Sequence, residues 1–462
     1  MKKLRDLLPI DSDLVVEGIT DDSRLVQKNF LFVATKGYYV DHFDYIEDAI
    51  QNGCCFIVCD RELPISFPHY VVDDIQAFFL ELCRKYYDVS LEDFRFIGIT
   101  GTDGKTTSTT IVKELLEHCA YIGTNGVEVD SKSYGTSNTT PCISELYRDL
   151  SLVQEYGYHT VAMEVSSEAL LHDRIHDFSY DVVGFTNITG DHLNVHKTFE
   201  DYVSCKMKLL DYLKKDGYVV YNGDDELLKN IQHPHSISFG FSSNNLYVIQ
   251  EVEYLERETI ITLSYQDLSW TIHSPLIGKY NVYNVVMAFI IGRLYLVDDY
   301  LLLQKIQELR PIKGRGEFLD FGQNFDIVLD YAHTVNGIRS ILETFQNYET
   351  VIVVTGSAGG RETLKRSVIG KIVMDMSDFT IFTMDDPRNE DPDDIIDQMV
   401  GDSKDYYRIV DREDAISFAL SIAPPKSVVL ILGKGRDNYM AIGDKKIHYN
   451  DYDVIHNYFN KE

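Results

Sequence analysis

The feature that most constrains the fold of this chain is a glycine-rich turn in the stretch FRFIGITGTDGKTTSTTIVKELLEHC, residues 94–119. The apolar run over 94–99 predicts a buried strand, and Gly101 and Gly104 then interrupt the pattern. From Thr107 onward the spacing of the apolar residues predicts a helix. A strand, a tight turn and a helix N-terminus bring backbone N–H groups together, which makes an anion-binding site. The segment therefore predicts an α/β domain that binds a phosphate group.

Two side chains of this turn suggest a nucleotide. Lys105 can reach a terminal phosphate, and the hydroxyl of Thr106 follows at the position where loops of this kind hold Mg²⁺. The fit to the pattern G-x-x-x-x-G-K-[ST] is incomplete, because Ile99 stands where the first glycine belongs and Gly98 comes one place early. An ordinary strand-to-helix turn is the alternative. The cluster of glycine, lysine and hydroxyl residues directly after a strand favours the nucleotide site.

The charge of the chain limits its other partners. It has 43 lysines and arginines against 73 aspartates and glutamates, a net charge of −30. Phosphate backbones and anionic membranes repel such a chain, and it has no basic patch, so we expect no binding to nucleic acid. A polyanionic substrate would have to be held by local cations and Mg²⁺.

The cysteines and apolar runs bear on the compartment. Seven scattered cysteines without a C-x-x-C pair argue against a disulfide framework or a zinc site and favour a reducing cytoplasm. The first residues, MKKLRDLLPIDSD, hold no apolar stretch long enough for a signal peptide, and no run is long enough for a membrane span. We expect a cytoplasmic protein, and a monomer.

At 462 residues the chain is long enough for about three domains. Residues 1–90 alternate short apolar runs with polar turns, as in a small α/β domain. Residues 91–309 contain the glycine-rich turn and, over 246–278, a β-rich tract that predicts an antiparallel insert. In residues 310–462 strands alternate with helices, which predicts a mostly parallel, Rossmann-like sheet. The predicted fold class is α/β, with three domains around a shared cleft.

Polar residues stand at the ends of several predicted strands. In parallel sheets ligands gather at the carboxyl ends of the strands, so these residues are candidates for a site. They are Glu164, Asn187, Asp330, Gly356, Asp385 and Lys434.

Three of the polar segments could hold a cation. Glu164 ends an apolar run and could complete an Mg²⁺ shell, because Mg²⁺ prefers a few hard oxygens beside phosphate and water; an N-cap or surface carboxylate is the alternative. His192 and His196 are spaced as in H-E-x-x-H, but the glutamate is missing, so one ligand of a phosphate-bound cation explains His192 better. Lys206 lies among helix-spaced apolar residues and would not stand out by itself.

Basic residues of the C-terminal third could hold an anion. Arg361, Lys365 and Arg366 form a basic cluster directly after a glycine turn. Solvated helix charge is one explanation and anion capture is the other, which the glycine turn favours modestly. Arg388 follows Pro387, whose ring restricts the backbone, and an arginine can bind a carboxylate through two hydrogen bonds.

Taken in this order, the segments resemble the Mur ligases, and within that family the branch that adds a diamino acid to UDP-N-acetylmuramoyl-L-alanyl-D-glutamate. The resemblance covers nearly the whole chain, and so many motifs in family order are specific. The motifs are DDSR…FVATKG (21–37), GTDGKTT (101–107), NTTP (138–141), MEVSS, FTNITGDHLNVH, the lysine of YVSCK, PLIGKYNVYN (275–284), GRGE, DYAHT, GGR…KR, DDPRNEDP and GKGRD.

The resemblance implies a role for each matching residue. The positions implied to contact ATP are Gly101, Thr102, Gly104, Lys105, Thr106, Thr107, Asn281, Asn284, Arg315 and Asp330. Those implied to meet the UDP-linked substrate are Ser23, Arg24, Asn138, Thr139, Thr140, Ser166 and Arg174. Those implied to meet the amino acid are Arg361, Asp385, Asp386, Arg388, Gly433 and Asp437. The implied metal positions are Thr106, Glu164, His192 and Lys206, and the implied catalytic residues are Lys105, Glu164, His192 and Lys206.

The family resemblance also implies a chemistry. ATP phosphorylates the terminal carboxylate of the UDP-linked dipeptide, an amine attacks the acyl phosphate, and phosphate leaves an amide behind. Two anions must meet, so the enzyme has to neutralise charge and align the reactants. Lys105, Mg²⁺ and Arg361 or Lys365 would neutralise the charge, and Lys206, carbamylated in this family, would ligate Mg²⁺ as an anion. His333 as the base for the amine is a hypothesis independent of the family.

The chain departs from the family pattern at several positions. Asp103 replaces the usual asparagine of the loop and adds negative charge near the phosphates, and Glu168 replaces the histidine that commonly follows the paired serines. Asp386 replaces the asparagine of the D-N-P-R signature, and the usual G-K-G-H-E ends here in Arg436 and Asp437. These changes bear on ATP affinity, on the UDP-linked substrate and on the choice of amino acid.

The choice between two amino acids stays open. Arg388 suits the second carboxylate of meso-diaminopimelate, which lysine lacks, and favours diaminopimelate slightly. The extra carboxylate of Asp386 could equally favour the plain ammonium group of L-lysine.

Three other functions are alternatives. A related amide ligase such as a folylpolyglutamate synthetase is disfavoured by the DDSR…FVATKG and NTTP segments, which fit a UDP-sugar. A degenerate member that binds without catalysis is disfavoured because Lys105, Glu164, His192 and Lys206 are all present. A phosphate-loop ATPase that acts on nucleic acid is disfavoured by the net charge of −30.

Overall fold

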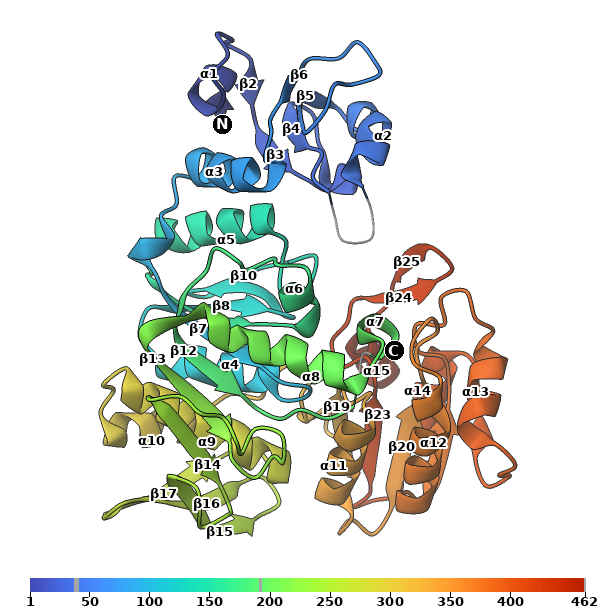
Figure 1. The fold of residues 1–462 in the computed structure, drawn as a ribbon. Helices are drawn as coiled ribbons and strands as arrows, with labels where there is room; N and C mark the ends of the chain where they lie inside the picture. Colours follow the sequence, from blue (N-terminus) through green and yellow to red (C-terminus); the bar gives the residue numbers. More distant parts are fainter. Residues whose placement is uncertain (37–40, 191–192, 461–462) are drawn as a thin grey trace. The chain divides into compact units, whose positions relative to one another are not determined.

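The computed structural model describes residues 1–36, 41–190 and 193–460. These residues form two compact units, and Figure 1 shows their helices and strands. The first unit comprises Met1–Thr100, Glu117–Val183 and Cys205–Tyr218, and the second comprises Gly101–Leu116, Gly184–Ser204 and Val219–Glu462.

The N-terminal part of the first unit is a parallel four-stranded sheet flanked by helices. Its order is β3-β4-β5-β6, and a short β1–β2 pair lies outside it. Phe32, Ile57 and Ala49 contribute to its apolar core. This confirms the α/β character expected at the N-terminus. The elements are β1 Lys2–Lys3, α1 Leu4–Leu7, β2 Val15–Val16, β3 Gly18–Thr20, β4 Phe30–Val33, α2 Ile46–Gln51, β5 Cys54–Cys59, β6 His69–Val71 and α3 Ile75–Tyr87.

The rest of the first unit contains five strands of a second, eleven-stranded sheet. These strands run in the order β10-β9-β8-β11-β7; β8, β11 and β7 are parallel, whereas β9 and β10 are antiparallel additions. The elements are β7 Arg95–Thr100, β8 Cys119–Gly123, β9 Gly126–Val129, β10 Lys132–Tyr134, α5 Ile143–Glu155, β11 Thr160–Glu164 and α6 Ser167–Leu171. Three further elements, β12 Tyr180–Phe185, α8 Phe199–Met207 and β13 Leu213–Asn222, contain the chain positions where one unit passes into the other.

The first half of the second unit combines helices with antiparallel strands. Strands β13, β14, β15, β16 and β17 are neighbours in that order. Strands β15, β16 and β17 are antiparallel, which confirms the insert expected over 246–278. Most residues of helix α9 are buried, and the helix packs against α4 and α10. The elements are α4 Lys105–Leu115, α7 Leu193–His196, β14 Ser236–Gly240, β15 Tyr247–Tyr254, β16 Thr259–Tyr265, β17 Leu268–Ser274, α9 Lys279–Leu294 and α10 Asp299–Gln307.

The second half of this unit is a six-stranded sheet of order β18-β19-β23-β20-β21-β22. Only β18 is antiparallel, so the mostly parallel sheet expected in the C-terminal third is confirmed. A separate hairpin of β24 and β25 follows. The elements are β18 Glu317–Leu319, β19 Asp326–Asp330, α11 Val335–Phe345, β20 Val351–Thr355, α12 Leu364–Met376, β21 Phe379–Phe382, α13 Pro392–Val400, β22 Tyr407–Arg408, α14 Arg412–Ile422, β23 Val428–Leu432, β24 Tyr439–Ile442, β25 Lys445–His448 and α15 Asp451–Phe459.

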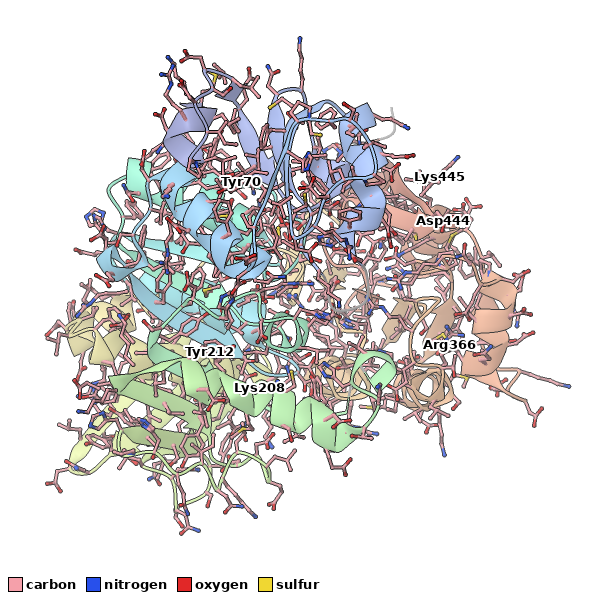
Figure 2. The ribbon with its side chains drawn as sticks, turned by 45° about the horizontal axis from the view of Figure 1, so that its top comes forward. Tyr70, Lys208, Tyr212, Arg366, Asp444 and Lys445 are labelled. Atoms are coloured by element: carbon pink, nitrogen blue, oxygen red, sulfur yellow. The ribbon has the colours of Figure 1, made fainter. Side chains whose placement is uncertain are left out.

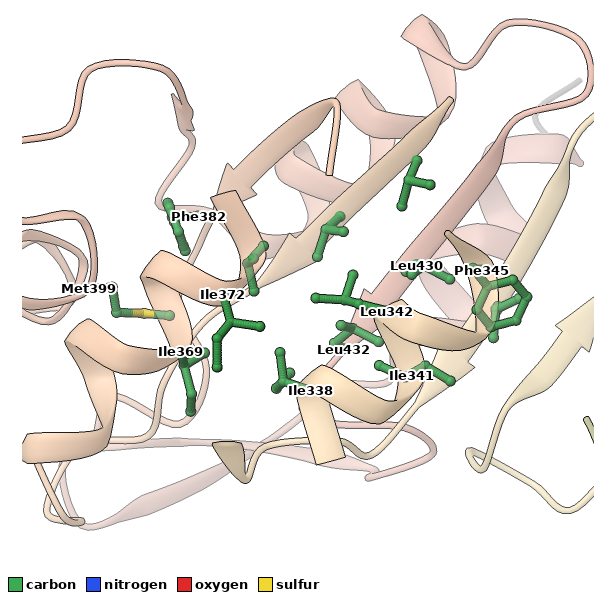
Figure 3. Packing of buried hydrophobic residues seen from close by; sticks show 14 of the residues in the cluster. Ile338, Ile341, Leu342, Phe345, Ile369, Ile372, Phe382, Met399, Leu430 and Leu432 are labelled. Carbon is green, nitrogen blue, oxygen red and sulfur yellow. The ribbon is translucent and has the colours of Figure 1, made fainter. Parts of the chain in front are cut away.

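This sheet is covered on both faces because successive side chains of a strand point to opposite sides. Leu430 and Leu432 of β23 pack with α11, α12 and α13 on one face, as Figure 3 shows in close-up. Val429 and Ile431 pack with α14 and α15 on the other face. All five residues of β23 are buried, as expected of a central parallel strand. The predicted α/β class is therefore confirmed.

A membrane span is not found in the described parts of the chain, where no helix is both long enough and apolar enough to cross a bilayer.

Candidate functional site

The glycine-rich turn joins β7 to α4. The helix begins at Lys105, two residues before the start expected from the apolar spacing, because Gly104 caps it with a φ of 85°. A Cβ atom on Gly104 would stand 2.5 Å from Asn284 Oδ1, and one on Gly101 would stand 1.8 Å from Thr186 Oγ1. Both positions therefore require glycine.

The backbone of the turn is fixed by the segment after β12. Thr102 N donates to Asn187 O at 2.9 Å, and Asp103 N donates to Asn187 Oδ1 at 3.0 Å. Asp103 O accepts from Asn187 Nδ2 at 3.1 Å and from Thr186 Oγ1 at 2.6 Å. Asn187, which the sequence marks as a strand-end residue, thus shapes the turn rather than facing a ligand through its amide.

The hydroxyl of Thr102 belongs to a buried hydrogen-bond chain. It accepts from Thr189 N at 2.9 Å and lies 3.0 Å from both Thr189 O and the phenolic oxygen of Tyr202. Tyr202 is fully buried on α8. Nothing in the sequence pattern singles out this tyrosine, because its partner lies 100 residues away.

The phosphate-loop side chains are held within the second unit. Lys105 Nζ donates to Gly101 O and to Thr102 O, both at 2.9 Å, so its ammonium group lies over the turn. Thr106 Oγ1 accepts from Arg315 Nη2 at 3.1 Å. This contact brings together two of the expected ATP positions.

The expected pair on α9 also reaches the loop helix. Asn284 Oδ1 accepts from Ser108 Oγ at 3.0 Å, and Asn284 Nδ2 donates to Asn281 Oδ1 at 3.1 Å. Asn281 Nδ2 donates to Ile277 O at 2.9 Å. Both amides are buried and therefore support the loop.

Asp330 ends β19 and is buried beside Arg315. Its carboxylate accepts from Gly316 N at 2.6 Å and from Ala332 N at 2.7 Å. Burial raises the pKa of Asp330 to about 6, although the Arg315 charge and the two backbone donors act in the opposite direction, and the Asp103 charge adds to the increase.

Asp103 also contacts the start of α11. Thr334 Oγ1 lies 3.1 Å from Asp103 Oδ1 and 3.2 Å from Oδ2, and the same hydroxyl accepts from Gly337 N as the N-cap of α11. The departure from the family pattern at position 103 thus places a carboxylate against a helix N-terminus, where negative charge is favoured.

In the first unit, Glu164 is completely buried at the end of β11. Its carboxylate accepts from the hydroxyl of Tyr121, from Thr124 N at 2.9 Å and from Thr124 Oγ1 at 3.2 Å. A Cβ on Gly123 would stand 2.3 Å from Glu164 Oε1. The carboxylate is therefore an oriented, hydrogen-bonded group, and the surface or N-cap alternative does not apply.

Residues expected at the UDP-linked substrate gather beside Glu164. Thr140 Oγ1 donates to Glu164 O at 2.9 Å and lies 3.3 Å from Ser166 Oγ, and Arg174 Nη1 donates to Thr140 O at 3.1 Å. Thr139 Oγ1 lies 3.1 Å from the hydroxyl of Thr124. Asn138 and Glu168 flank this cluster, Asn138 exposed and Glu168 partly exposed.

Ser23 and Arg24 lie in a short 3₁₀ helix, Ser23–Leu25, between β3 and β4 of the N-terminal part. Ser23 is buried, and its carbonyl accepts from Asn52 Nδ2 at 2.9 Å. The Arg24 guanidinium is exposed and pairs with Asp22, with Nε 2.8 Å from Oδ1.

Lys206 lies near the end of α8 and is only 1% exposed. Its neighbour Cys205 donates to Ser167 O at 3.2 Å, which ties the end of α8 to the start of α6. His192 lies outside the described residues. Within the described ranges no three His, Cys, Asp or Glu side chains come together as a possible metal centre.

The carboxyl edge of the C-terminal sheet carries a buried ion pair. Lys434, 1% exposed, donates to Asp386 Oδ1 at 2.8 Å and lies 3.6 Å from Asp437 Oδ2. Ala441 N also donates to Asp386 Oδ1, at 3.0 Å. Oδ1 of Asp386 is therefore engaged by Lys434 and by the backbone of the β24–β25 hairpin.

Two other carboxylates share this edge. Burial raises the pKa of Asp437 to about 6, with Lys434 acting in the opposite direction and Asp385 and Asp386 adding to the increase. Burial also raises the pKa of Asp385, against the charges of Arg412 and Lys434. A Cβ on Gly433 would stand 2.1 Å from Asp385 Oδ2, so this strand end requires glycine.

Beneath this edge lies a second ion pair that the sequence did not single out. Arg412 donates to Asp451 through Nε and Nη2, both at 2.8 Å, and to Leu432 O at 3.0 Å. Both side chains are at most 1% exposed. The pair fastens the starts of α14 and α15 to the end of β23.

The basic cluster expected at 361–366 divides in the structure. Arg366 is fully buried and paired with Glu390, so neither solvated charge nor anion capture describes it. Arg361 and Lys365 are partly exposed. Arg388 has a φ of 53°, and its guanidinium forms no ion pair within the described part of the chain.

The structure also bears on the added charge of Arg436 and on His333 as a base. The charge of Arg436 is paired, since Nε lies 2.8 Å and Nη2 2.6 Å from the carboxylate of Glu317. His333 is exposed, and its Nδ1 lies 2.8 Å from Tyr331 O. One ring nitrogen is thereby engaged by the backbone, and the role of base stays a hypothesis.

Comparison with known proteins agrees with the arrangement of these elements. Three protein-family models match the chain, described as Mur ligase family, catalytic domain (residues 15–78), Mur ligase middle domain (99–292) and Mur ligase, glutamate ligase domain (314–435). A UDP-N-acetylmuramoyl-L-alanyl-D-glutamate–2,6-diaminopimelate ligase of Bacillus cereus is 32% identical over 456 residues, which cover 95% of this chain and 93% of that protein.

Solved structures share the fold. The structure of a UDP-N-acetylmuramoyl-L-alanyl-D-glutamate–2,6-diaminopimelate ligase matches with a TM-score of 0.63 at 26% identity, over 99% of both chains. A MurF ligase from Thermotoga maritima, in complex with ADP, matches with a TM-score of 0.67 at 20% identity, over 91% of this chain and 95% of that one. The class is thus an α/β ligase of peptide-bond-forming type, and the chain belongs to the Mur ligase family.

Proposed function

We propose that this ligase uses ATP to join a diamino acid to UDP-N-acetylmuramoyl-L-alanyl-D-glutamate, a step of peptidoglycan precursor synthesis in the cytoplasm. The observation that carries the proposal is the match over 95% of the chain to a relative named for this reaction with 2,6-diaminopimelate. The three matched family segments support domains at 1–90, 91–309 and 310–462.

ATP is the proposed phosphate donor. The turn at 101–106 presents a helix N-terminus and the ammonium group of Lys105 to an anion, and Arg315 adds a second cation beside Thr106. The ADP complex of the Thermotoga MurF ligase, a protein of the same fold, agrees with this assignment. Lys105 and Arg315 would neutralise the charge that develops as the phosphoryl group moves to the substrate carboxylate.

The metal proposed for this site is Mg²⁺. Glu164 offers buried carboxylate oxygens of the kind that Mg²⁺ prefers. The family resemblance adds the hydroxyl of Thr106 and the anionic oxygen of a carbamylated Lys206 as further donors. When bound, Mg²⁺ would neutralise phosphate charge. Glu164 itself is held in orientation by Tyr121 and Thr124, and this oriented carboxylate is what the chain supplies.

The proposed substrates meet different parts of the chain. Ser23, Arg24, Thr140 and Ser166 would bind the UDP-linked dipeptide, and the carboxyl edge of the C-terminal sheet would bind the diamino acid. Lys434 already balances the charge of Asp386, which weakens the reason to favour lysine, whereas Arg388 has no carboxylate partner within the described residues. Both observations favour meso-diaminopimelate over L-lysine.

The test is phosphate release from ATP with the UDP-linked muramoyl dipeptide, with meso-diaminopimelate and L-lysine assayed in parallel. Turnover with diaminopimelate alone is expected, and Arg388→Ala should impair it selectively. Turnover with lysine alone would overturn the assignment of the amino acid. No acceptor-dependent turnover with either would overturn the proposed reaction.

Lys206 has a separate test. Lys206→Ala should lose most activity, and short carboxylates should restore part of it if a carbamate normally ligates the metal. Lys208→Ala is the matched control, because Lys208 is exposed two residues away on the same segment. Full activity of Lys206→Ala would exclude the carbamate.

A further inference from the structure

Arg366 is a fully buried arginine of the C-terminal sheet region that no step of the proposed reaction uses. It lies near the start of α12, and Figure 2 shows it among the packed elements of this region. Its guanidinium donates from Nη1 to Glu390 Oε2 at 2.7 Å and from Nη2 to Glu390 Oε1 at 3.1 Å. Burial of an unpaired charge destabilises a fold, and pairing of this kind offsets the penalty. The position of Arg366 therefore needs an explanation.

The pair joins two turns that follow neighbouring strands. Arg366 Nη2 also donates to Ala358 O at 2.9 Å, in the glycine turn after β20. Glu390 lies after β21, and its Oε1 accepts from Gly360 N as well. One ion pair, between the fully buried Arg366 and the 33% exposed Glu390, therefore holds the glycine turn at 358–360 against the loop at 385–390.

The joined turns enclose Arg388. Gly359 N donates to Asp386 O at 3.0 Å, and a Cβ on Gly359 would stand 1.9 Å from Pro387 O, so the two turns are in direct backbone contact. A Cβ on Gly360 would stand 3.6 Å from both Cδ and Nη1 of Arg388, which shows that the arginine side chain passes over this glycine.

The backbone of Arg388 is fixed from the other side by the β24–β25 hairpin. Arg388 N donates to Ala441 O at 2.9 Å, and Gly443 N donates to Arg388 O at 2.8 Å. Asp444 and Lys445, labelled in Figure 2, form the turn and the start of the second strand of this hairpin. With φ values of 43° at Asp386 and 53° at Arg388, the loop has a left-handed backbone that non-glycine residues rarely adopt. Such a backbone persists only where its surroundings hold it.

We propose that the Arg366–Glu390 pair is a positioning device for Arg388. By fastening the glycine turn to the 385–390 loop, the pair fixes the place of the Arg388 guanidinium in the amino-acid site and thereby sets the preference for the diamino acid. Arg366 and Glu390 are positioning residues, since neither contacts the reacting atoms. This inference rests on the proposed function.

The experiment measures KM for all three substrates in Glu390→Gln and in the wild type. Glu390→Gln removes the charge and one acceptor of the pair. We expect KM for the preferred diamino acid to rise about tenfold or more, with KM for ATP and for the UDP-linked dipeptide within about twofold, because a loss of about 1.4 kcal/mol of binding is tenfold in affinity. The ratio of diaminopimelate to lysine turnover should fall.

The matched control is Asp393→Asn. Asp393 is another arginine-paired carboxylate three residues along the chain, but it is 55% exposed and pairs with Arg408 on the surface. This variant should leave all three KM values unchanged.

A double-mutant cycle separates positioning from general stability. In an Arg388→Ala background, Glu390→Gln should cause no further rise in KM for the diamino acid, since the residue through which it acts is gone. A further rise of the same size, or an equal rise in all three KM values, would overturn the proposal. If Glu390→Gln does not fold, Gln398→Met tests the same device, because Gln398 Oε1 accepts from Arg366 Nη1 at 2.8 Å. We expect a smaller change with the same selectivity.

The outcome is distinguishable from failure of the proposed function. A wild-type enzyme without acceptor-dependent phosphate release would refute the reaction itself. An active wild type whose diamino acid KM is unaffected by Glu390→Gln and Gln398→Met would refute only the positioning role.

Discussion

The phosphate turn and the carboxyl edge of the C-terminal sheet are built in different ways. The turn is a contiguous stretch from Gly101 to Thr106, held by neutral hydrogen bonds from the segment around Asn187. The sheet edge draws its residues from separate strand ends and joins them by buried ion pairs such as Lys434 with Asp386. The difference teaches that a local site can rely on backbone geometry, whereas an assembled site depends on matched charges.

The largest effect on stability should come from breaking an ion pair beneath the carboxyl edge of the C-terminal sheet, called the assembled edge below because its residues come from separate strand ends. Arg412→Met leaves Asp451 buried without its partner, so the free energy of unfolding should fall by about 3–5 kcal/mol. Arg24→Met, which removes an arginine that is 86% exposed, should change it by about 1 kcal/mol or less. Urea-induced unfolding measures both. Equal losses in the two variants would mean that the assembled edge does not depend on its buried pairs.

The next effect concerns the local turn. Lys105→Ala removes the ammonium group that lies over Gly101 O and Thr102 O, and phosphate release should slow by about 100-fold or more, because a cation at a transferring phosphate stabilises the transition state. The fold should survive, since the turn is held by other hydrogen bonds. Lys229→Ala, an exposed lysine of the same unit, is the control. Steady-state kinetics and a melting curve check both statements. Unfolding of Lys105→Ala would contradict the statement that other hydrogen bonds are sufficient to hold the turn.

These predictions show where the sequence was sufficient. Strand β7, the turn and α4 follow from a contiguous pattern of apolar residues and glycines, and the parallel C-terminal sheet follows from alternating strands and helices. The pairs of the assembled edge did not follow, because their members are 24, 48 and 119 residues apart in Arg366–Glu390, Lys434–Asp386 and Arg436–Glu317. The sequence alone does not distinguish a charged residue that is exposed to solvent from one that is buried beside a distant partner. The role of Lys206 came from family resemblance alone, and the roles of Lys206 and His192 remain predictions.

A smaller effect should appear in the pH dependence of the assembled edge. The pKa of Asp437 is raised to about 6, so its carboxylate ionises as the pH rises through that value. If it binds an ammonium group of the diamino acid, KM for that substrate should fall as the pH rises from 5 to 7. Asp437→Asn should remove this component of the profile, and an unchanged profile would exclude Asp437 as the responsible group.

The same raised pKa has a stability consequence. The native state holds the proton of Asp437 between its ordinary pKa of about 4 and the raised value near 6, so its contribution to stability is complete at low pH and is lost as the pH rises through 6. Asp330, with a pKa also raised to about 6, acts in the same direction. Unfolding free energies of Asp437→Asn should therefore depend less on pH over this window than those of the wild type.

The smallest effect should come from neutralising the turn. Asp103→Asn removes a negative charge near the phosphates and keeps an acceptor for Thr334, so KM for ATP should fall by about two- to fivefold, the equivalent of about 0.5–1 kcal/mol. The gain should shrink at high salt. Titration of ATP at two ionic strengths is the measurement, and a KM that rises would show that the contact between Asp103 and the start of α11 matters more than the charge.

The pairing of Arg436 with Glu317 and of Lys434 with Asp386 limits how this enzyme can exchange parts with its relatives. In a chimera that received only the 385–390 loop of a protein with asparagine at position 386, Lys434 would be left buried beside a neutral amide. A graft of the 433–437 segment that replaced Arg436 would likewise leave Glu317 without its partner. Divergence of this edge must therefore proceed by linked substitutions in distant segments, and successful recombinants should be those that inherit both members of each pair.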